Sequence, residues 1–132
     1  MSDEKEEARV IGIGGVFFRS RDPAALQAWY AEHLGLPVHA DGAVVLPWQR
    51  ADGTATPEST IWAPFAQDTD YFGPGGSQLM VNLIVSDLDG MLTRLRAAGI
   101  EVLPDVEEMS YGRFGWFVDP DGRRVELWEP MR

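Results

Sequence analysis

The segment Glu126-Leu127-Trp128-Glu129-Pro130 near the end of the chain repeats the pattern of Thr60-Ile61-Trp62-Ala63-Pro64, with tryptophan and proline at matching places. A second pair of segments, 16–22 and 81–87, lies a similar distance apart. Each of these is an apolar, strand-like run that reaches an aspartate and then a helical pattern. Two similar units in so short a chain predict one compact fold with a pseudo-twofold relation, and a binding groove where the halves meet.

The composition is that of one folded domain. The chain has 132 residues, 45% of them hydrophobic and 24% charged, which is enough to bury roughly two-thirds of its unfolded surface. The formal net charge is -10, so we expect neither nucleic acid nor an anionic membrane as a partner. Residues 1–9 hold an acidic run and are predicted to be a disordered leader, which leaves 10–130 as the domain.

Cysteine is absent, which excludes disulfides, zinc–thiolate sites, iron–sulfur clusters and thiol nucleophiles. The sequence has no apolar run of about 18 residues and no cationic leader before an apolar core. We therefore expect neither a membrane span nor a secretory signal, and a cytoplasmic location by default.

The first module, residues 10–65, has the pattern of a strand, a helix and three more strands. Asp22 and Pro23 supply the N-cap and first position of a helix that ends before Gly35. The sequence Asp41-Gly42 indicates a hairpin turn. The predicted strands are residues 10–20, 37–39, 43–49 and 59–63.

The second module, residues 79–130, repeats this order. Asp87 caps its helix, Gly99 ends it, and residues 119–122 form a tight turn. The predicted strands are residues 79–85, 100–103, 113–118 and 124–129. Residues 66–78 lie between the modules and are either an ordinary linker or a flap that lays Tyr71 and Phe72 over the groove.

The two units, Asp22-Pro23 after the first strand, and the segment Phe117-Val118-Asp119-Pro120-Asp121-Gly122-Arg123-Arg124-Val125-Glu126-Leu127 resemble the vicinal oxygen chelate superfamily. That superfamily holds the glyoxalase I, bleomycin-resistance and extradiol dioxygenase proteins. The resemblance covers almost all of residues 10–130. It implies an α+β fold of two paired βαβββ modules, which form a curved mixed sheet with a central groove.

The resemblance also implies where a metal would bind. In the metal-using members, a divalent ion lies on four side chains, from the first and last strands of both units. The corresponding positions here are Gly15, Met80, Thr60 and Glu126, of which only Glu126 keeps its ligand type. Because nickel, zinc or iron sites need three or four protein ligands, we expect no cofactor, with a divalent metal as the alternative. His33 and His39 are expected to be surface residues.

Alternation along the strands predicts which residues line the groove. Gly15 shares its face with Phe17 and Arg19, Met80 with Asn82, Thr60 with Trp62, and Glu126 with Trp128. The predicted ligand-binding residues are Phe17, Arg19, Trp48, Thr60, Trp62, Met80, Asn82, Tyr111, Trp116 and Trp128.

Glu126 is the candidate catalytic residue. An apolar groove would raise the pKa of Glu126 and suit it to proton transfer, whereas a salt bridge with Arg19 would lower that pKa and leave Glu126 structural or ligand-orienting. The sequence leaves both alternatives open.

The leading hypothesis is a metal-independent protein that binds a small molecule, resembling the bleomycin-resistance branch and sequestering a cationic or flat aromatic ligand. The alternative is a glyoxalase-like lyase or isomerase that uses Glu126 as general base or as a residual metal ligand, with Arg19 or Asn82 stabilising developing charge. In a third hypothesis the groove is the seam of a homodimer, which we expect the chain to form.

Overall fold

The computed structural model describes residues 7–131, which fold into two compact units. One unit is Gly14–Val81, and the other consists of the described residues up to Ile13 with those from Asn82 onward. The boundaries cut through the first strand of each module. Among these residues, neither helix is long and apolar enough to cross a membrane.

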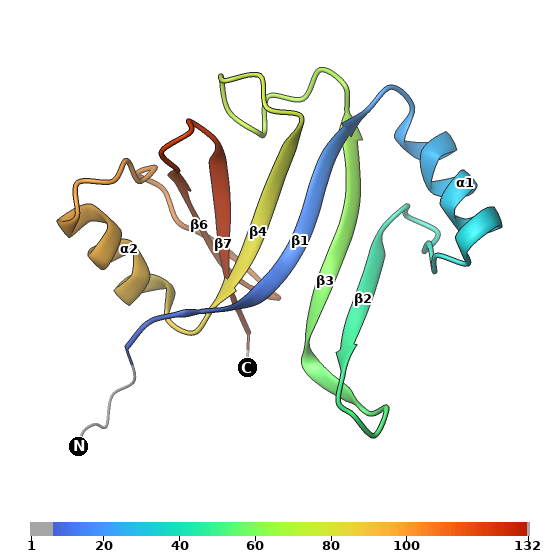
Figure 1. The fold of residues 1–132 in the computed structure, drawn as a ribbon, viewed down its shortest axis with the longest axis horizontal. Helices are drawn as coiled ribbons and strands as arrows, with labels where there is room; N and C mark the ends of the chain where they lie inside the picture. Colours follow the sequence, from blue (N-terminus) through green and yellow to red (C-terminus); the bar gives the residue numbers. More distant parts are fainter. Residues whose placement is uncertain (1–6, 132) are drawn as a thin grey trace. The chain divides into compact units, whose positions relative to one another are not determined.

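The first module holds a mixed sheet of three strands with one helix beside it (Figure 1). Its sheet order is β2-β3-β1, in which β1 runs parallel to β3 and β2 runs antiparallel to β3. The helix contacts β3. The elements are β1 (Val10–Ser20), α1 (Pro23–Leu34), β2 (Val44–Gln49) and β3 (Ala55–Ala66).

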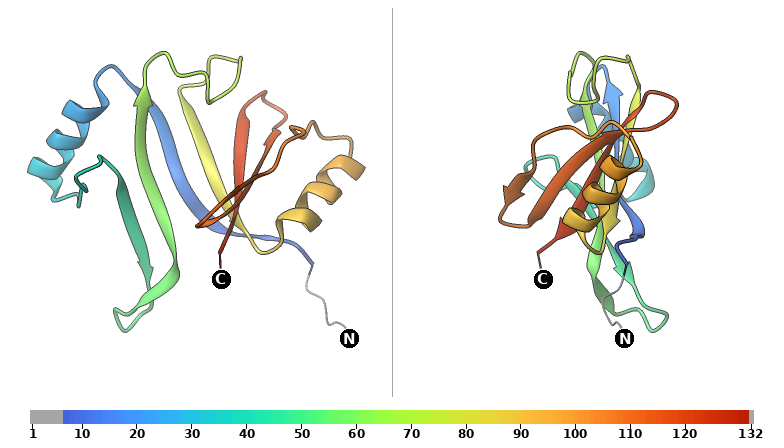
Figure 2. Two further views of the ribbon diagram at one scale, coloured as in Figure 1. Left: turned by 180° about the vertical axis from the view of Figure 1, so that it is seen from behind. Right: turned by 90° about the vertical axis from the view of Figure 1, so that its left-hand side faces the viewer.

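The second module has the same plan with one more strand. Its sheet order is β4-β7-β6-β5, with β4 parallel to β7 and the other pairs antiparallel. The helix packs against β6 and β7, as the views from behind and from the side show (Figure 2). The elements are β4 (Leu79–Val85), α2 (Leu88–Ala97), β5 (Glu107–Met109), β6 (Gly112–Val118) and β7 (Arg124–Pro130).

Both helices begin at the aspartates that the sequence predicted as caps. A carboxylate oxygen of Asp22 accepts a hydrogen bond from the Ala25 N–H, and one of Asp87 accepts from the Gly90 N–H, both at 3.1 Å. Each bond satisfies a backbone donor that the first turn of a helix leaves unpaired. The first helix ends at Gly35, whose φ of 69° is left-handed.

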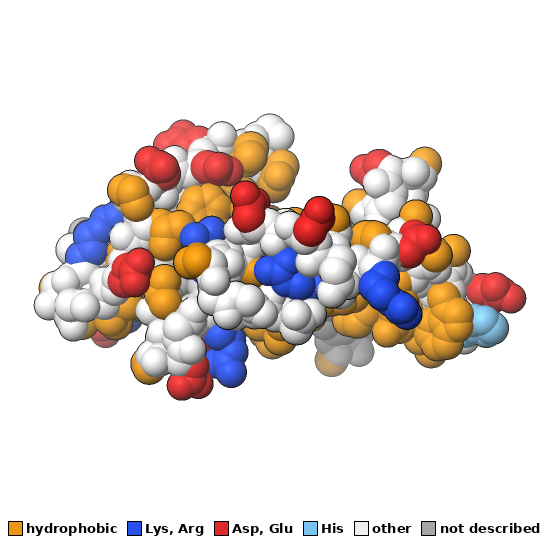
Figure 3. All heavy atoms as spheres, turned by 90° about the horizontal axis from the view of Figure 1, so that it is seen from above, with side chains coloured by type: hydrophobic (Ala, Val, Ile, Leu, Met, Phe, Trp, Pro, Cys, Tyr) orange, Lys and Arg blue, Asp and Glu red, His pale blue; other side chains and the backbone are white. Residues whose placement is uncertain are grey.

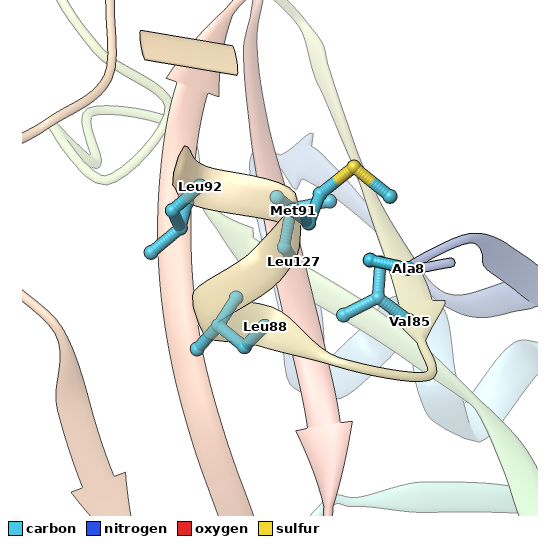
Figure 4. Close-up of a cluster of buried hydrophobic side chains, with 6 residues drawn as sticks. All are labelled: Ala8, Val85, Leu88, Met91, Leu92 and Leu127. Carbon is cyan, nitrogen blue, oxygen red and sulfur yellow. The ribbon is translucent and has the colours of Figure 1, made fainter. Parts of the chain in front are cut away.

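A cluster of apolar side chains holds α2 on its sheet (Figure 4). Leu88, Met91 and Leu92 of the helix pack with Val85 of β4 and Leu127 of β7. Burying each of these side chains stabilises the fold by about 1.5–3 kcal/mol. This cluster fixes which face of β7 points toward the helix.

The predicted leader is folded at its end. Residues 1–6 lie outside the described part of the chain, but Ala8 is 6% exposed and belongs to the cluster under α2. The Arg9 N–H donates to the Ser86 hydroxyl, and the Arg94 guanidinium donates to the Ala8 carbonyl oxygen. These contacts place the folded boundary before residue 10.

The predicted α+β class with mixed sheets is confirmed, with local differences. The predicted strands 37–39 and 100–103 each form one isolated bridge, Val38 to Val44 and Val102 to Phe117. The strand predicted at 59–63 is longer, because Asp52-Gly53 makes a hairpin turn between β2 and β3 that the sequence analysis missed. It also missed the three-residue strand β5.

Gly112 tests the packing at the start of β6. Its φ is +148°, and a Cβ there would lie 2.5 Å from Trp128 Nε1 and 2.6 Å from the Glu129 carbonyl oxygen. We expect Gly112→Ala to lower the free energy of unfolding by about 2–4 kcal/mol, from backbone strain and overpacking. The control is Gly53→Ala, where φ is +87° and a Cβ would meet nothing within 4 Å. Urea denaturation measures both, and equal losses would contradict the packing argument.

Candidate functional site

The site is a row of three buried side chains across β4, β7 and β6. Asn82 lies opposite Glu126 in the parallel pair, and Trp116 lies opposite Glu126 in the antiparallel pair. Asn82 Nδ2 donates to Glu126 Oε1 at 2.6 Å, and Trp116 Nε1 donates to Glu126 Oε2 at 3.0 Å. Glu126 is 3% exposed and Asn82 is 2% exposed. Both carboxylate oxygens thus accept a hydrogen bond from a neighbouring strand.

A second, aromatic row lies beside this polar row on the same face. Trp128 lies opposite Phe114, and the two rings stack with centroids 5.8 Å apart and an interplanar angle of 9°. Tyr111 packs edge-on against Phe114 at 5.7 Å, and its carbonyl oxygen accepts from Trp128 Nε1 at 3.3 Å. Because Tyr111 is 57% exposed, it forms the solvent end of the row.

Both rows lie on the face of the sheet opposite α2. Side chains alternate along a strand, and Leu127 of β7 is in the cluster under the helix. A Cβ at Gly115, which pairs with Leu127, would touch Leu92 at 3.2 Å. Glu126 and Trp128 therefore point to the other face.

The Asn82 side chain leaves an acceptor unused. Its Oδ1 atom is buried and has no hydrogen-bond partner among the described residues. An unpaired buried acceptor costs roughly 1–3 kcal/mol. A ligand that donates a hydrogen bond here would remove that cost and would also lie beside the Glu126 carboxylate.

The Arg19 guanidinium binds the segment between the modules. Its guanidinium donates to the carbonyl oxygens of Gln67, Thr69 and Ser77 at 2.9, 2.7 and 2.8 Å. It also lies 5.1 Å above the centre of the Phe72 ring. Three of its five N–H groups are therefore engaged by backbone carbonyl oxygens, and the role of Arg19 in a groove stays a prediction.

The aromatic residues of segment 66–78 pack inside the first unit. Phe72 is buried, and both it and Tyr71 contact Phe65, with Tyr71 stacked at 5.5 Å and 3°. Phe65 in turn contacts Phe17 at 5.4 Å. The segment is therefore a packed loop rather than a plain linker.

The register of β1 and β3 divides the predicted groove residues of the first module into two sets. Phe17 lies opposite Ala63, so the odd-numbered residues of both strands share one face. Thr60 and Trp62 are even-numbered residues of β3 and point to the other face. This corrects the prediction that all of them line one groove.

Trp62 is a partly buried residue on the side of the sheet that α1 covers. Its ring lies 4.8 Å from Phe18 and 5.3 Å from Tyr30 of the helix. Thr60 points to the same face, where its hydroxyl accepts from Trp48 Nε1 at 2.7 Å. These residues support the fold of the first module.

The strand registers also change which residue of the first module corresponds to Glu126 of the second. When the modules are aligned on the aspartates that cap their helices, Phe17 takes the place of Asn82. Phe17 pairs with Ala63 as Asn82 pairs with Glu126. The residue equivalent to Glu126 is therefore Ala63, not Thr60, and the first module has apolar groups where the second has a carboxylate and an amide.

The residues present do not fit a metal centre. Among residues 7–131, no three His, Asp or Glu side chains form a group that could hold an ion. In the second module, Glu126 and Asn82 offer two oxygen ligands, fewer than metal sites require. Met80 is buried. His33 and His39 are exposed, as predicted.

The fold and the site define a protein of the glyoxalase-like class. The family model described as "Glyoxalase-like domain" matches residues 15–128, and the chain belongs to this family. This confirms the resemblance to the vicinal oxygen chelate superfamily. None of the curated proteins compared with the chain matches it.

Solved structures share the fold at low sequence identity. Methylmalonyl-CoA epimerase from Mycobacterium tuberculosis is 20% identical, with a TM-score of 0.61 over 93% of this chain and 90% of that chain. A variant of the Streptomyces coelicolor epimerase, in complex with 2-nitronate-propionyl-CoA, is 16% identical, with a TM-score of 0.67 over 94% and 100%. A Legionella pneumophila protein described as NAD-dependent benzaldehyde dehydrogenase is 17% identical, with a TM-score of 0.57 over 89% and 98%. The fold thus serves proteins described by different activities.

Sequence reasoning named Asn82, Trp116 and Glu126 but missed that they bond to one another. The signal that could have found them is the parallel pairing of the first and last strands of a module, which places Asn82 beside Glu126. The predicted groove between the modules stays a prediction.

Arg19 is expected to set the order of loop 67–77. Arg19→Lys removes the planar fork of donors, so we expect amide hydrogen exchange in residues 67–78 to accelerate about tenfold or more, with a smaller change in the sheets. Arg50→Lys is the matched control, because Arg50 also donates to a backbone carbonyl, that of Ala55, at an exposed hairpin. Unchanged exchange in the loop of Arg19→Lys would refute the role of the guanidinium.

Trp116 is expected to stabilise the fold through its bond to a buried carboxylate. We expect Trp116→Phe to lower the free energy of unfolding by about 2–5 kcal/mol, because it removes a donor to a buried charge together with packing volume. Trp48→Phe is the comparison, since it removes a donor to a neutral, part-buried hydroxyl. In urea denaturation, we expect Trp48→Phe to lose at least about 1 kcal/mol less free energy of unfolding than Trp116→Phe. A larger loss in Trp48→Phe than in Trp116→Phe would contradict the argument that the hydrogen bond to Glu126 contributes more to stability.

Proposed function

We propose that this protein binds a small cationic or aromatic molecule on the Glu126 face of the second module, without a metal. The observation that carries the proposal is a buried carboxylate next to an unpaired acceptor, Asn82 Oδ1. Two acceptors side by side suit a ligand with N–H donors and positive charge. The stacked Phe114 and Trp128 rings beside them suit a flat ring.

The formal charge of -10 supports the same class of ligand. A negative surface raises the local concentration of cations and repels anions. Sequestration of such a molecule, as in the bleomycin-resistance branch of the superfamily, needs binding alone and no chemical step. Metal analysis of the purified protein accompanies the proposal, and a stoichiometric transition metal would overturn its metal-free part.

The experiment is a titration with cationic aromatic compounds, among them 2-naphthylmethylamine and proflavine, followed by tryptophan fluorescence. We expect Glu126→Gln to weaken binding about tenfold or more, because it removes the charge that the ligand pairs with while keeping the side-chain shape. The control is Glu129→Gln, which removes the same charge from β7 on the face toward α2, where Glu129 accepts from the Leu88 N–H.

Two results would sink the binding proposal. One is the absence of any fluorescence change in the unaltered protein up to high micromolar ligand. The other is an equal loss of affinity in Glu126→Gln and Glu129→Gln, which would show a general charge effect in place of a site.

A lyase or isomerase is the second candidate, favoured by the buried carboxylate itself. Glu126 would remove a proton next to a carbonyl, and the Asn82 amide would stabilise the developing charge. Asn82 suits this role better than Arg19, because three N–H groups of Arg19 already donate to backbone carbonyl oxygens. The structural likeness to epimerases that act on methylmalonyl-CoA suggests the probe.

Hydrogen exchange at C2 of methylmalonyl-CoA in D2O, followed by NMR, separates the two functions. A lyase or isomerase predicts exchange that Glu126→Gln abolishes while ligand binding persists. Sequestration predicts no exchange by the unaltered protein. If circular dichroism shows that Glu126→Gln is unfolded, Glu126→Asp takes its place in the experiment, because it keeps the charge and moves the carboxylate by one methylene.

We also propose that the chain forms a homodimer. Large apolar side chains are exposed at Met109 and Tyr111 beside the β5–β6 turn and at Met131, whose N–H donates to the Tyr111 carbonyl oxygen. Exposed apolar groups gathered in this way are typical of an interface. Gel filtration with light scattering tests this proposal, and a monomer at micromolar concentration would refute it.

A further inference from the structure

A hollow that is wide open to solvent lies beside the start of α1. Its volume is about 580 Å³, within the range of roughly 300–1,000 Å³ that small-molecule sites occupy. It lies wholly in the first unit and shares no residue with the Glu126 face. Its lining residues are Ser20, Arg21, Asp22, Ala25, Leu26, Trp29 and Tyr30.

Aromatic side chains form one wall of this hollow. Trp29 is 52% exposed and has the bulkiest side chain among the exposed apolar residues that the structure describes. Its ring packs edge-on against Tyr30, with centroids 5.2 Å apart and an interplanar angle of 84°. Tyr30 is held in place by its edge-on contact with Trp62 of β3. Figure 3 shows hydrophobic side chains gathered over α1, at the right of the view, beside a basic group. An exposed ring held by a fixed neighbour offers a stacking surface that loses little entropy on binding.

Some polar groups of the hollow already make hydrogen bonds, and others are available to a ligand. Asp22 Oδ1 already accepts the Ala25 N–H, and the Ser20 hydroxyl oxygen accepts the Asp22 N–H at 3.2 Å, which leaves its proton free to donate. The Arg21 guanidinium has no hydrogen bond or ion pair among the described residues. The Arg21 guanidinium is therefore the charged group of the hollow that has all its N–H donors to spare, while Asp22 keeps its negative charge and its second carboxylate oxygen.

We infer that this hollow is a second ligand site, which binds an aromatic carboxylate. The ring would pack on Trp29 and Leu26, and the carboxylate would pair with Arg21 and accept from the Ser20 hydroxyl. This site differs from the one proposed on the Glu126 face, because its ion-pair partner is the Arg21 guanidinium and not a carboxylate.

The test is an NMR titration of the full, 15N-labelled chain with 2-naphthoate, its neutral analogue 2-naphthamide, and cationic 2-naphthylmethylamine. The indole N–H signal of Trp29 is assigned from the one that disappears in Trp29→Phe. We expect 2-naphthoate to shift this signal and the amides of residues 20–30, with a Kd that is roughly millimolar for so small a ligand. The neutral amide should bind about two- to fivefold more weakly, as the loss of an exposed ion pair predicts.

Arg21→Gln should lower the affinity for 2-naphthoate to that for 2-naphthamide and leave 2-naphthamide binding unchanged. Arg50→Gln removes the same charge from another exposed position of the first unit and should change neither affinity. Because the two sites share no residue, Glu126→Gln should also leave 2-naphthoate binding unchanged, so either proposal can fail while the other stands.

Three results would overturn the inference. The first is unchanged 2-naphthoate affinity in Arg21→Gln. The second is tighter binding of 2-naphthylmethylamine than of 2-naphthoate at the Trp29 signal. The third is the absence of a Trp29 shift at several millimolar 2-naphthoate.

Discussion

The pairing of β7 between β4 and β6 is the constraint on which the second module depends. Val125 and Leu127 of β7 alternate with Glu126 and Trp128, so only one register places the leucine under α2 and the carboxylate on the far face. A shift by one residue would turn Glu126 toward Leu88 and Leu92, away from the Asn82 and Trp116 donors that now hold its carboxylate. The apolar cluster and the polar row therefore fix each other.

The sequence predicted well those features whose causes are local. An aspartate cap, a proline at the first helical position and a glycine with positive φ each act within a few residues, so both helices were predicted within one or two residues of their ends. The strands at 10–20 and 79–85 are long apolar runs and agree with β1 and β4. Residues 37–39 and 100–103 form single bridges, because neighbouring strands and not local pattern decide whether a short segment extends a sheet.

The site was harder to predict because it depends on register. Trp62 and Trp128 occupy the same place in two similar segments, yet Trp62 points toward the helix of its module and Trp128 points away from it. Side chains alternate with a period of two, so a small difference in alignment reverses the face. Similarity between two segments carries no information on their partner strands. For this reason the sequence matched Glu126 with Thr60, whereas the paired strands match it with Ala63.

Arg19 shows that the pattern of one strand predicts the face of a side chain but not its hydrogen-bond partners. Alternation placed its side chain correctly on the face of Phe17, but the backbone of loop 67–77 then supplied acceptors that no strand partner satisfies. A guanidinium has five donors in a fixed fork and can bind several carbonyl oxygens at once. Backbone carbonyl oxygens of this loop therefore became partners of the cation, which the strand pattern alone does not reveal.

The energetics of the polar row favour a functional role for it. A buried charge with its donors is often no more stabilising than apolar side chains of similar volume, and the unpaired Asn82 Oδ1 adds a cost of its own. The first module shows the apolar solution at the equivalent positions, Phe17 and Ala63. Because the same scaffold folds with apolar groups there, folding alone does not require a carboxylate and an amide in the second module. Recognition of a donor-bearing ligand gives a physical reason for both groups.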